Sequence, residues 1–164
     1  MIRIIKSYIG GIRWSVGCFI VSYSIYFVVI MKKVLTFGVY DMLHIGHMLL
    51  FKRAKELGDY LIVAVQDGEC ILKYKPGTEM IYTTDERLYM VSAIRYVDEV
   101  VTYKDVDVDI QNIDFDVFVK GPDQCHAGFQ RAVKWCQEHG KEVIELARTE
   151  GISSTMLREY SKTR

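Results

Sequence analysis

Short runs of β-branched and aromatic residues alternate with helical patterns along most of the chain, from about residue 33 to its end. The runs that predict strands are 33–37, 60–66, 99–102, 116–120 and 142–146. Apolar positions three or four apart predict helices over 45–57, 84–95, 105–112, 128–139 and about 154–161. Gly58 and Gly140 follow two of these helices as stops, and Thr83 with Glu86 spells a capping box before a third. The alternation predicts an α/β fold, a parallel sheet flanked by helices.

The first thirty residues follow a different pattern. Trp14 to Ile30 is a run of 17 residues without charge, with basic residues on both sides, and its length is near the lower limit for a membrane span. Met31 then opens MKKVLTFGVYD, which has the form of a natural N-terminus leading straight into a strand. We therefore expect residues 1–30 to be a hydrophobic extension, either a mis-assigned start or an N-terminal membrane anchor. One domain then covers 31–160, with a tail at 161–164.

Composition narrows the classes of function. A chain of 164 residues with 50% hydrophobic content can bury the core of one domain. It carries 21 basic and 21 acidic side chains without a long basic block, which argues against nucleic acid as a partner, so any phosphate site must be local. The 4 cysteines form no CxxC pair, and the core needs no disulfides, which favours the reducing cytoplasm.

Two histidines, His44 and His47, stand around Gly46 at the start of a predicted helix that follows the first strand of the domain. Residues three apart are neighbours on a helix, so both imidazoles can face one ligand. The glycine gives a phosphate access to the backbone, and a helix start supplies free N–H groups. Two histidines with Asp41 could instead bind a metal, or the pair could be ordinary half-exposed side chains. An anion site suits these neighbours best.

A second candidate site is the segment ARTEGISST, residues 147–155, before the last predicted helix. Gly151 gives a flexible approach, and three hydroxyl side chains follow it at Ser153, Ser154 and Thr155. Alone, these residues could simply cap the helix, which is the usual role of Ser and Thr there. Carboxyl ends of parallel strands share one sheet edge, so we expect segments 38–47, 120–128 and 148–155 to meet there. Two anion sites at one edge indicate a polyphosphate ligand.

These motifs carry a family resemblance. LHIGH after a strand ending in FGVYD, then RYVDEVV, DVFVKG and RTEGISST, in this order, resemble the HxGH nucleotidyltransferases, particularly the glycerol-3-phosphate cytidylyltransferases. The resemblance implies a Rossmann-like nucleotidylyltransferase domain and an enzyme that uses CTP, a phosphorylated alcohol and Mg²⁺. The alcohol phosphate attacks the α-phosphate in line and releases pyrophosphate, giving a CDP-alcohol such as CDP-glycerol. It also implies a cytoplasmic homodimer, with membrane contact only if residues 1–30 are real.

The resemblance also assigns residues. His44 and His47 are implied to contact the triphosphate and stabilise the transition state, and Asp41 to lie near the magnesium. The other implied nucleotide ligands are Val39, Tyr40, Gly46, Asp123, Arg148, Thr149, Gly151, Ile152, Ser153, Ser154 and Thr155. The implied ligands of the acceptor phosphate are Lys73, Lys75 and Arg87. Of these we count Lys73 as catalytic. As an alternative, these lysines are ordinary loop residues.

Two departures from the family pattern affect these assignments. Val39 stands where members commonly have Thr, so only a backbone contact is carried over, and Pro122 stands at a position that is often acidic. Two alternatives stay open: an adenylyltransferase or sugar-phosphate nucleotidyltransferase of the same fold, or a nucleotide-binding protein without turnover.

Overall fold

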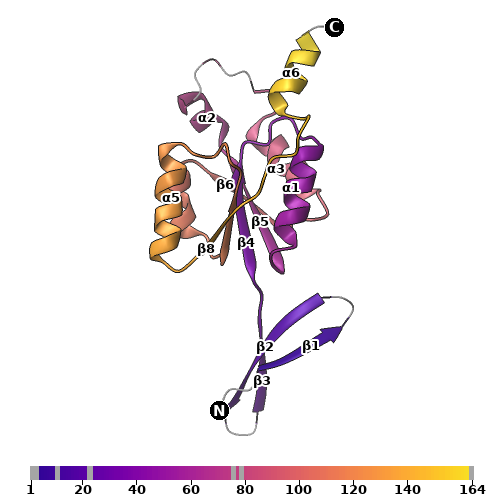
Figure 1. The fold of residues 1–164 in the computed structure, drawn as a ribbon, viewed down its shortest axis with the longest axis vertical. Coiled ribbons are helices and arrows are strands. Elements are labelled where there is room, and N and C mark those ends of the chain that lie inside the picture. Colours follow the sequence, from indigo (N-terminus) through magenta and orange to yellow (C-terminus); the bar gives the residue numbers. More distant parts are fainter. Residues whose placement is uncertain (1–3, 10–11, 22–23, 75–76, 78–79, 163–164) are drawn as a thin grey trace.

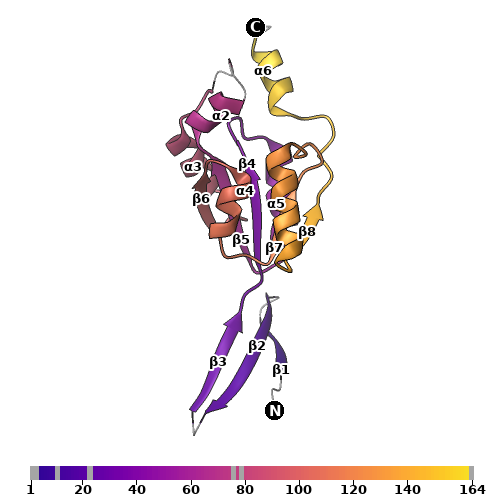
Figure 2. The same ribbon diagram turned by 90° about the vertical axis from the view of Figure 1, so that its left-hand side faces the viewer.

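The structure is a computed structural model that describes residues 4–9, 12–21, 24–74, 77 and 80–162. Its first strands, β1 (Ile4–Ile9), β2 (Ile12–Val21) and β3 (Ser24–Ile30), form an antiparallel sheet in that order. This sheet lies apart from the rest of the fold, joined to it by the chain just before β4 (Figures 1 and 2). The charge-free run 14–30 therefore lies largely in strands, and among the described residues no helix is long and apolar enough to cross a membrane.

The remaining strands form one parallel sheet of five, in the order β6-β5-β4-β7-β8. They are β4 (Lys33–Gly38), β5 (Tyr60–Gln66), β6 (Glu99–Tyr103), β7 (Val117–Lys120) and β8 (Glu142–Glu145). The chain runs outward from β4 through β5 to β6, then crosses to the other side of β4, where β7 and β8 follow. This confirms the predicted Rossmann-like sheet. It also puts the reversal of strand order, where such sheets bind ligands, between β4 and β7.

Helices cover both faces of the sheet (Figure 1). On one face lie α1 (Ile45–Lys55) and α3 (Thr84–Ser92), and on the other α4 (Val106–Asp109), the short 3-10 helix η1 (Ile110–Asn112) and α5 (Ala127–Glu138). Along β4, Val34 packs toward α1, whereas Leu35 and Phe37 pack toward α5. Each face thus has its own apolar core, as expected for a sheet buried on both sides.

Two further helices lie at the carboxyl edge of the sheet: α2 (Gly68–Tyr74) and α6 (Ser154–Lys162) (Figures 1 and 2). The sequence predicts α6 but not α2, where it indicates only a polar connection after the second strand of the domain. In the structure Asp67 accepts a hydrogen bond from the Glu69 N–H at 2.9 Å, so a local cap starts this helix of about two turns.

The predicted helix ends are largely confirmed. Thr83 and Glu86 form the expected reciprocal capping box at the start of α3. A Cβ at Gly58 would lie 2.5 Å from the Lys32 carbonyl oxygen, so only glycine lets the chain pass there after α1. Gly140, after α5, adopts a left-handed φ of 66°. Helix α3 ends at Ser92, three residues before the predicted end.

Candidate functional site

His44 is the N-cap of α1, and its Nδ1 accepts a hydrogen bond from the Gly46 N–H at 3.1 Å. The neutral ring therefore carries its proton on Nε2, which leaves that N–H free to donate to a ligand. A Cβ at position 46 would lie 2.9 Å from two atoms of this ring, so a side chain there would displace the imidazole. The backbone N–H of Gly46 thus sets the tautomer of His44, and the missing side chain leaves room for its ring.

His47 follows one turn later, and its ring stacks on that of His44 with centroids 3.9 Å apart and planes at 22°. Its Nδ1 is buried and has no hydrogen-bond partner among the described residues. Burial lowers the pKa of His47 from 6.5 to about 4, and His44 and Arg148 contribute smaller effects in the same direction. Burial and Arg148 also lower the pKa of His44. Both imidazoles are therefore neutral hydrogen-bond donors at neutral pH.

Tyr40 packs against the histidine pair on its buried side. Its buried ring packs edge-on against His47, with centroids 5.2 Å apart, and against Phe51 at 5.1 Å. The residue has a φ of 55°, a left-handed conformation that is uncommon for a bulky side chain. A Cβ at Gly38 would collide with the Tyr40 ring at 2.4 Å, so glycine is required at the end of β4. The family resemblance implies that Tyr40 is a nucleotide ligand, and sequence reasoning misses this packing role.

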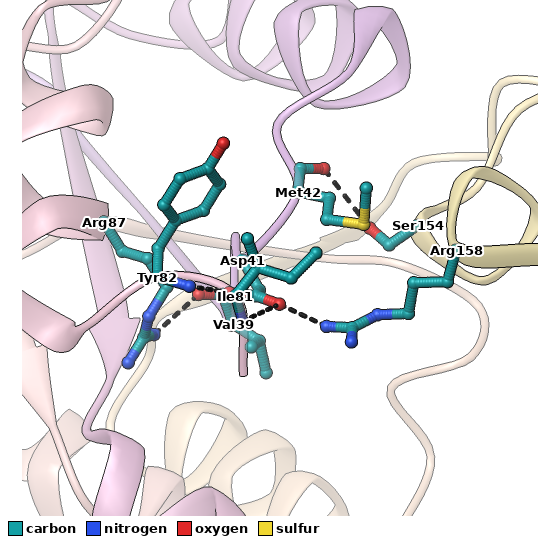
Figure 3. A network of polar contacts seen from close by, with 8 residues as sticks. All are labelled: Val39, Asp41, Met42, Ile81, Tyr82, Arg87, Ser154 and Arg158. Carbon is teal, nitrogen blue, oxygen red and sulfur yellow. Dashed lines mark hydrogen bonds and ion pairs between the residues drawn. The ribbon is translucent and has the colours of Figure 1, made fainter. Parts of the chain in front are cut away.

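Asp41 lies in the interior, 3% exposed, and its carboxylate is already engaged (Figure 3). One oxygen accepts hydrogen bonds from the Ile81 N–H at 3.1 Å and the Tyr82 N–H at 2.9 Å, and the other pairs with the guanidinium of Arg158. A carboxylate with these donors does not fit the implied role of magnesium ligand. Among the residues that the structure describes, no cluster of three or more His, Cys, Asp or Glu side chains could hold a metal ion.

Arg87 is fully buried, and this position does not fit the expected contact with an acceptor phosphate. Its guanidinium donates to the carbonyl oxygens of Val39 at 2.8 Å and Gln66 at 2.7 Å, and to the Thr84 hydroxyl at 3.1 Å (Figure 3). These bonds tie the ends of β4 and β5 to the start of α3. They also engage the Val39 carbonyl oxygen, one of the backbone groups near the expected nucleotide site.

The glycine- and serine-containing segment lies against the histidine turn. The nearest Ile152 methyl carbon is 3.3 Å from the ideal Cβ position of Gly46. The Ser154 hydroxyl donates to the Met42 carbonyl at 3.4 Å (Figure 3), and Gly151 turns the chain with a φ of 74°. The starts of α1 and α6, which are far apart in the sequence, are therefore neighbours. This is the arrangement that the two-site interpretation predicts.

The rest of this segment is held by further contacts. The Ser153 hydroxyl accepts from the Met156 N–H at 3.1 Å, which is the capping role proposed as the alternative. The exposed Arg148 lies 3.8 Å from a carboxylate oxygen of Asp123, which connects the loops after β7 and β8. Thr149 is half-buried and Thr155 is exposed, each beside these groups in the chain. The predicted nucleotide ligands thus share one edge of the sheet.

Gln124 is a residue of this edge that sequence reasoning misses. Its side-chain oxygen accepts from the Gly121 N–H at 2.8 Å, and its side-chain nitrogen donates to the Phe37 carbonyl at 2.7 Å. The loop after β7 is thereby fixed to the end of β4, at the reversal of strand order. An amide near the turn GPDQ was the available signal, but its partner is 87 positions away in the chain.

An open cleft of about 450 Å³ lies between the starts of α2 and α3. It is lined by Asp67, Gly68, Glu69, Met80, Tyr82, Thr83 and Thr84. Of the predicted acceptor ligands, Lys73 lies in the last turn of α2, and Lys75 lies outside the described residues. Tyr82 lines this cleft and also donates its N–H to Asp41, so this residue links the cleft to the loop before the histidines.

Comparison with known proteins places these features in a family. The profile of the family described as cytidylyltransferase-like matches residues 35–160. The glycerol-3-phosphate cytidylyltransferase of Bacillus subtilis (strain 168) is 41% identical over 132 residues, covering 79% of this chain and 96% of that protein. Its counterpart in Staphylococcus aureus (strain NCTC 8325 / PS 47) is 42% identical over 133 residues, covering 79% and 94%.

The fold has a match among solved structures. The lipopolysaccharide core biosynthesis protein from Thermoplasma volcanium GSS1 superimposes with a TM-score of 0.59 at 26% identity, covering 73% of this chain and 97% of that chain. The family match spans the five-stranded domain, the histidine turn and most of α6.

Proposed function

Because the chain belongs to the cytidylyltransferase-like family, we propose that it transfers CMP from CTP to glycerol 3-phosphate and releases pyrophosphate. The product would be CDP-glycerol. The names of the two bacterial relatives support the nucleotide and the acceptor, and both relatives match over nearly their whole length.

The observation that carries the proposal is the contact between the two helix starts. The methyl group of Ile152 next to Gly46 brings the positive end of the α6 dipole beside the start of α1 and the two histidines. Two such starts, with Arg148 close by, supply the donors and the positive charge that a triphosphate needs. A monophosphate would need only one of them.

The reaction needs no nucleophile from the protein. An oxygen of the acceptor phosphate attacks the α-phosphorus of CTP, the new O–P bond forms, and the bond to the β-phosphate oxygen breaks in line. Negative charge shifts to the pyrophosphate as it leaves. His44, through its Nε2–H, and His47 donate hydrogen bonds to the phosphate oxygens in the transition state, and catalysis rests on positioning and charge stabilisation.

Magnesium stays part of the proposal, but with a different arrangement. Asp41 is buried and already engaged by Ile81, Tyr82 and Arg158, so it does not fit as a ligand of the ion. Mg²⁺ commonly binds through substrate phosphates and keeps several waters. We therefore expect it to arrive with the triphosphate, and we assign it no protein ligand.

The cleft between α2 and α3 is our candidate for the acceptor. Asp67 and Glu69 give it an acidic side, which suits the hydroxyl groups of a polyol because carboxylates accept hydrogen bonds from them. The acceptor phosphate would then point away from these carboxylates. Lys73 and Lys75, at and beyond the end of α2, are the expected cations for it.

Two further expectations accompany the proposal: a homodimer and a cytoplasmic location. The cysteines at 70, 125 and 136 are free thiols, which fits a reducing compartment. The family resemblance is the support for the dimer.

A substrate panel tests the proposal. The full-length protein is incubated with CTP, ATP, GTP or UTP, each combined with glycerol 3-phosphate or another phosphorylated alcohol, and pyrophosphate is measured. We expect the fastest release with CTP and glycerol 3-phosphate. Absence of pyrophosphate in every combination would reject the proposal in favour of a nucleotide-binding protein.

A further inference from the structure

One buried carboxylate joins three segments that are far apart in the sequence. Asp41 belongs to the loop that leads to the histidine turn, its N–H donors belong to residues 81 and 82 before α3, and its cationic partner belongs to α6 (Figure 3). Arg158 lies 117 positions after Asp41, and Tyr82 lies 41 positions after it. The carboxylate is therefore a junction between parts of the fold that the backbone does not connect directly.

The three segments carry different parts of the proposed reaction. Helix α6 begins with the serines of the nucleotide segment, and the Asp41 loop continues into His44. Tyr82 and the two threonines after it line the acceptor cleft. The Arg158 guanidinium and the backbone at the rim of that cleft are thus linked through the carboxylate of one side chain.

Helix α6 extends beyond the carboxyl edge of the sheet, with its far end away from the core (Figures 1 and 2). Its first turn is attached by the long hydrogen bond from Ser154 to Met42, at 3.4 Å, and its second turn by the ion pair of Arg158. The guanidinium side is 28% exposed and the carboxylate side 3%, so this pair is shielded from solvent far better than the surface pairs of α5.

We propose that Arg158 is a positioning residue that couples the nucleotide site to the acceptor site. When CTP binds at the start of α6, it holds that helix in place, and the Arg158–Asp41 pair then fixes residues 81 and 82 at the rim of the acceptor cleft. The coupling is reciprocal, because each substrate must favour the other to the same extent. The inference rests on the proposed function, and it adds a coupling between the affinities of the two sites.

The test measures binding without turnover. Glycerol 3-phosphate is titrated calorimetrically into the full-length protein, with and without saturating α,β-methylene CTP and magnesium. In the wild type we expect the acceptor to bind about fivefold or more tightly when the analogue is present. In Arg158→Gln the two affinities should agree within about twofold, because the junction has lost its cation. Arg158→Lys keeps the charge without the planar fork and should restore part of the ratio.

A matched control separates coupling from general stability. Arg131→Gln removes the same side chain from another ion pair, with Asp107, which lies between α4 and α5 at 2.6 Å. This variant should keep the wild-type ratio of affinities. Arg158→Gln should also raise the KM for glycerol 3-phosphate at saturating CTP by about fivefold or more while kcat changes by less than about threefold.

Several outcomes would overturn the inference. A wild-type ratio of affinities in Arg158→Gln would do so, as would equal acceptor affinity with and without the analogue in the wild-type protein. If Arg158→Gln does not fold, Arg158→Met takes its place, and an unchanged ratio of affinities in that variant would contradict the inference. A full loss of the ratio of affinities in Arg131→Gln would also contradict it. A wild-type protein that releases pyrophosphate but shows no coupling between the two substrates rejects the role of Arg158 alone. A wild-type protein that never releases pyrophosphate rejects the proposed function and this inference together.

Discussion

The ring of His47 stacks on the ring of His44, 3.9 Å between centroids, and packs edge-on against the ring of Tyr40, 5.2 Å between centroids. This stack holds both imidazoles together at the start of α1. Two neutral rings can lie this close because neither carries a charge at neutral pH. The proposed chemistry depends on this arrangement.

Replacing His47 by alanine should reduce kcat by about a hundredfold or more, the usual cost of losing a positioned transition-state donor. The fold should remain, because Tyr40 and Phe51 still fill the core below the ring. Steady-state kinetics and circular dichroism measure both effects. His139→Ala, which removes an exposed imidazole stacked on Trp135 at the end of α5, is the control and should leave kcat unchanged. A His47→Ala enzyme with near wild-type turnover would contradict the role.

The low pKa of His47 predicts a specific pH dependence. The folded protein holds this ring neutral down to about pH 4, whereas the ring in the unfolded chain takes up a proton near pH 6.5. The unfolded state therefore binds more protons between these values. The contribution of neutral His47 to the free energy of unfolding is fully present above about pH 6.5 and is lost as the pH falls toward about 4.

The measurement is an NMR titration of the imidazole protons together with thermal unfolding at several pH values. We expect the His47 resonance to titrate below pH 5, with about 4 as the midpoint, and the melting temperature of the wild type to fall more steeply than that of His47→Ala below pH 6.5. A midpoint near the ordinary value of 6.5 would contradict the effect of burial on this ring.

Arg87→Gln should destabilise the protein by about 2–4 kcal/mol, because buried carbonyls at the ends of β4 and β5 lose a charged donor. The KM of the folded enzyme for glycerol 3-phosphate should change little, since the guanidinium faces the interior. Denaturant unfolding and kinetics at low temperature separate the two effects. Normal stability with a tenfold higher acceptor KM would instead restore the phosphate-binding role.

Deleting residues 1–30 should leave a folded and active enzyme. The five-stranded sheet begins at Lys33, and the site residues named above lie downstream of it. Circular dichroism and pyrophosphate release are sufficient readouts. Aggregation or inactivity of the shortened chain, with activity of the full chain only in membranes, would instead identify the segment as an anchor.

Much of the fold could be predicted from the sequence because the strands are short apolar runs with clear stops. Helix α2 could not, because GECILKY is too short to show a period and carries a glycine at its start. The histidine turn is visible because its residues are adjacent, with Gly46 in contact with His44. Local motifs of this kind carry their own geometry.

The features that sequence reasoning missed are buried charges with distant partners. Arginine usually signals surface, yet Arg87 has no exposed area, because carbonyl oxygens from two strand ends converge on it. For Asp41, a position three residues before the histidine motif favours a metal ligand, and only the tertiary structure brings Arg158 to it. Such pairings depend on how the helices dock, which periodicity does not encode.

The central claim is cytidylyl transfer to glycerol 3-phosphate, and quantitative product analysis tests it most directly. The full-length protein is incubated with magnesium, glycerol 3-phosphate and equal concentrations of CTP and ATP, and products are separated and identified by mass spectrometry. The account predicts CDP-glycerol and pyrophosphate in equal amounts, with CTP used at least about tenfold more efficiently than ATP, a difference of about 1.4 kcal/mol in transition-state binding. Equal use of both triphosphates, or a preference for ATP, would contradict it.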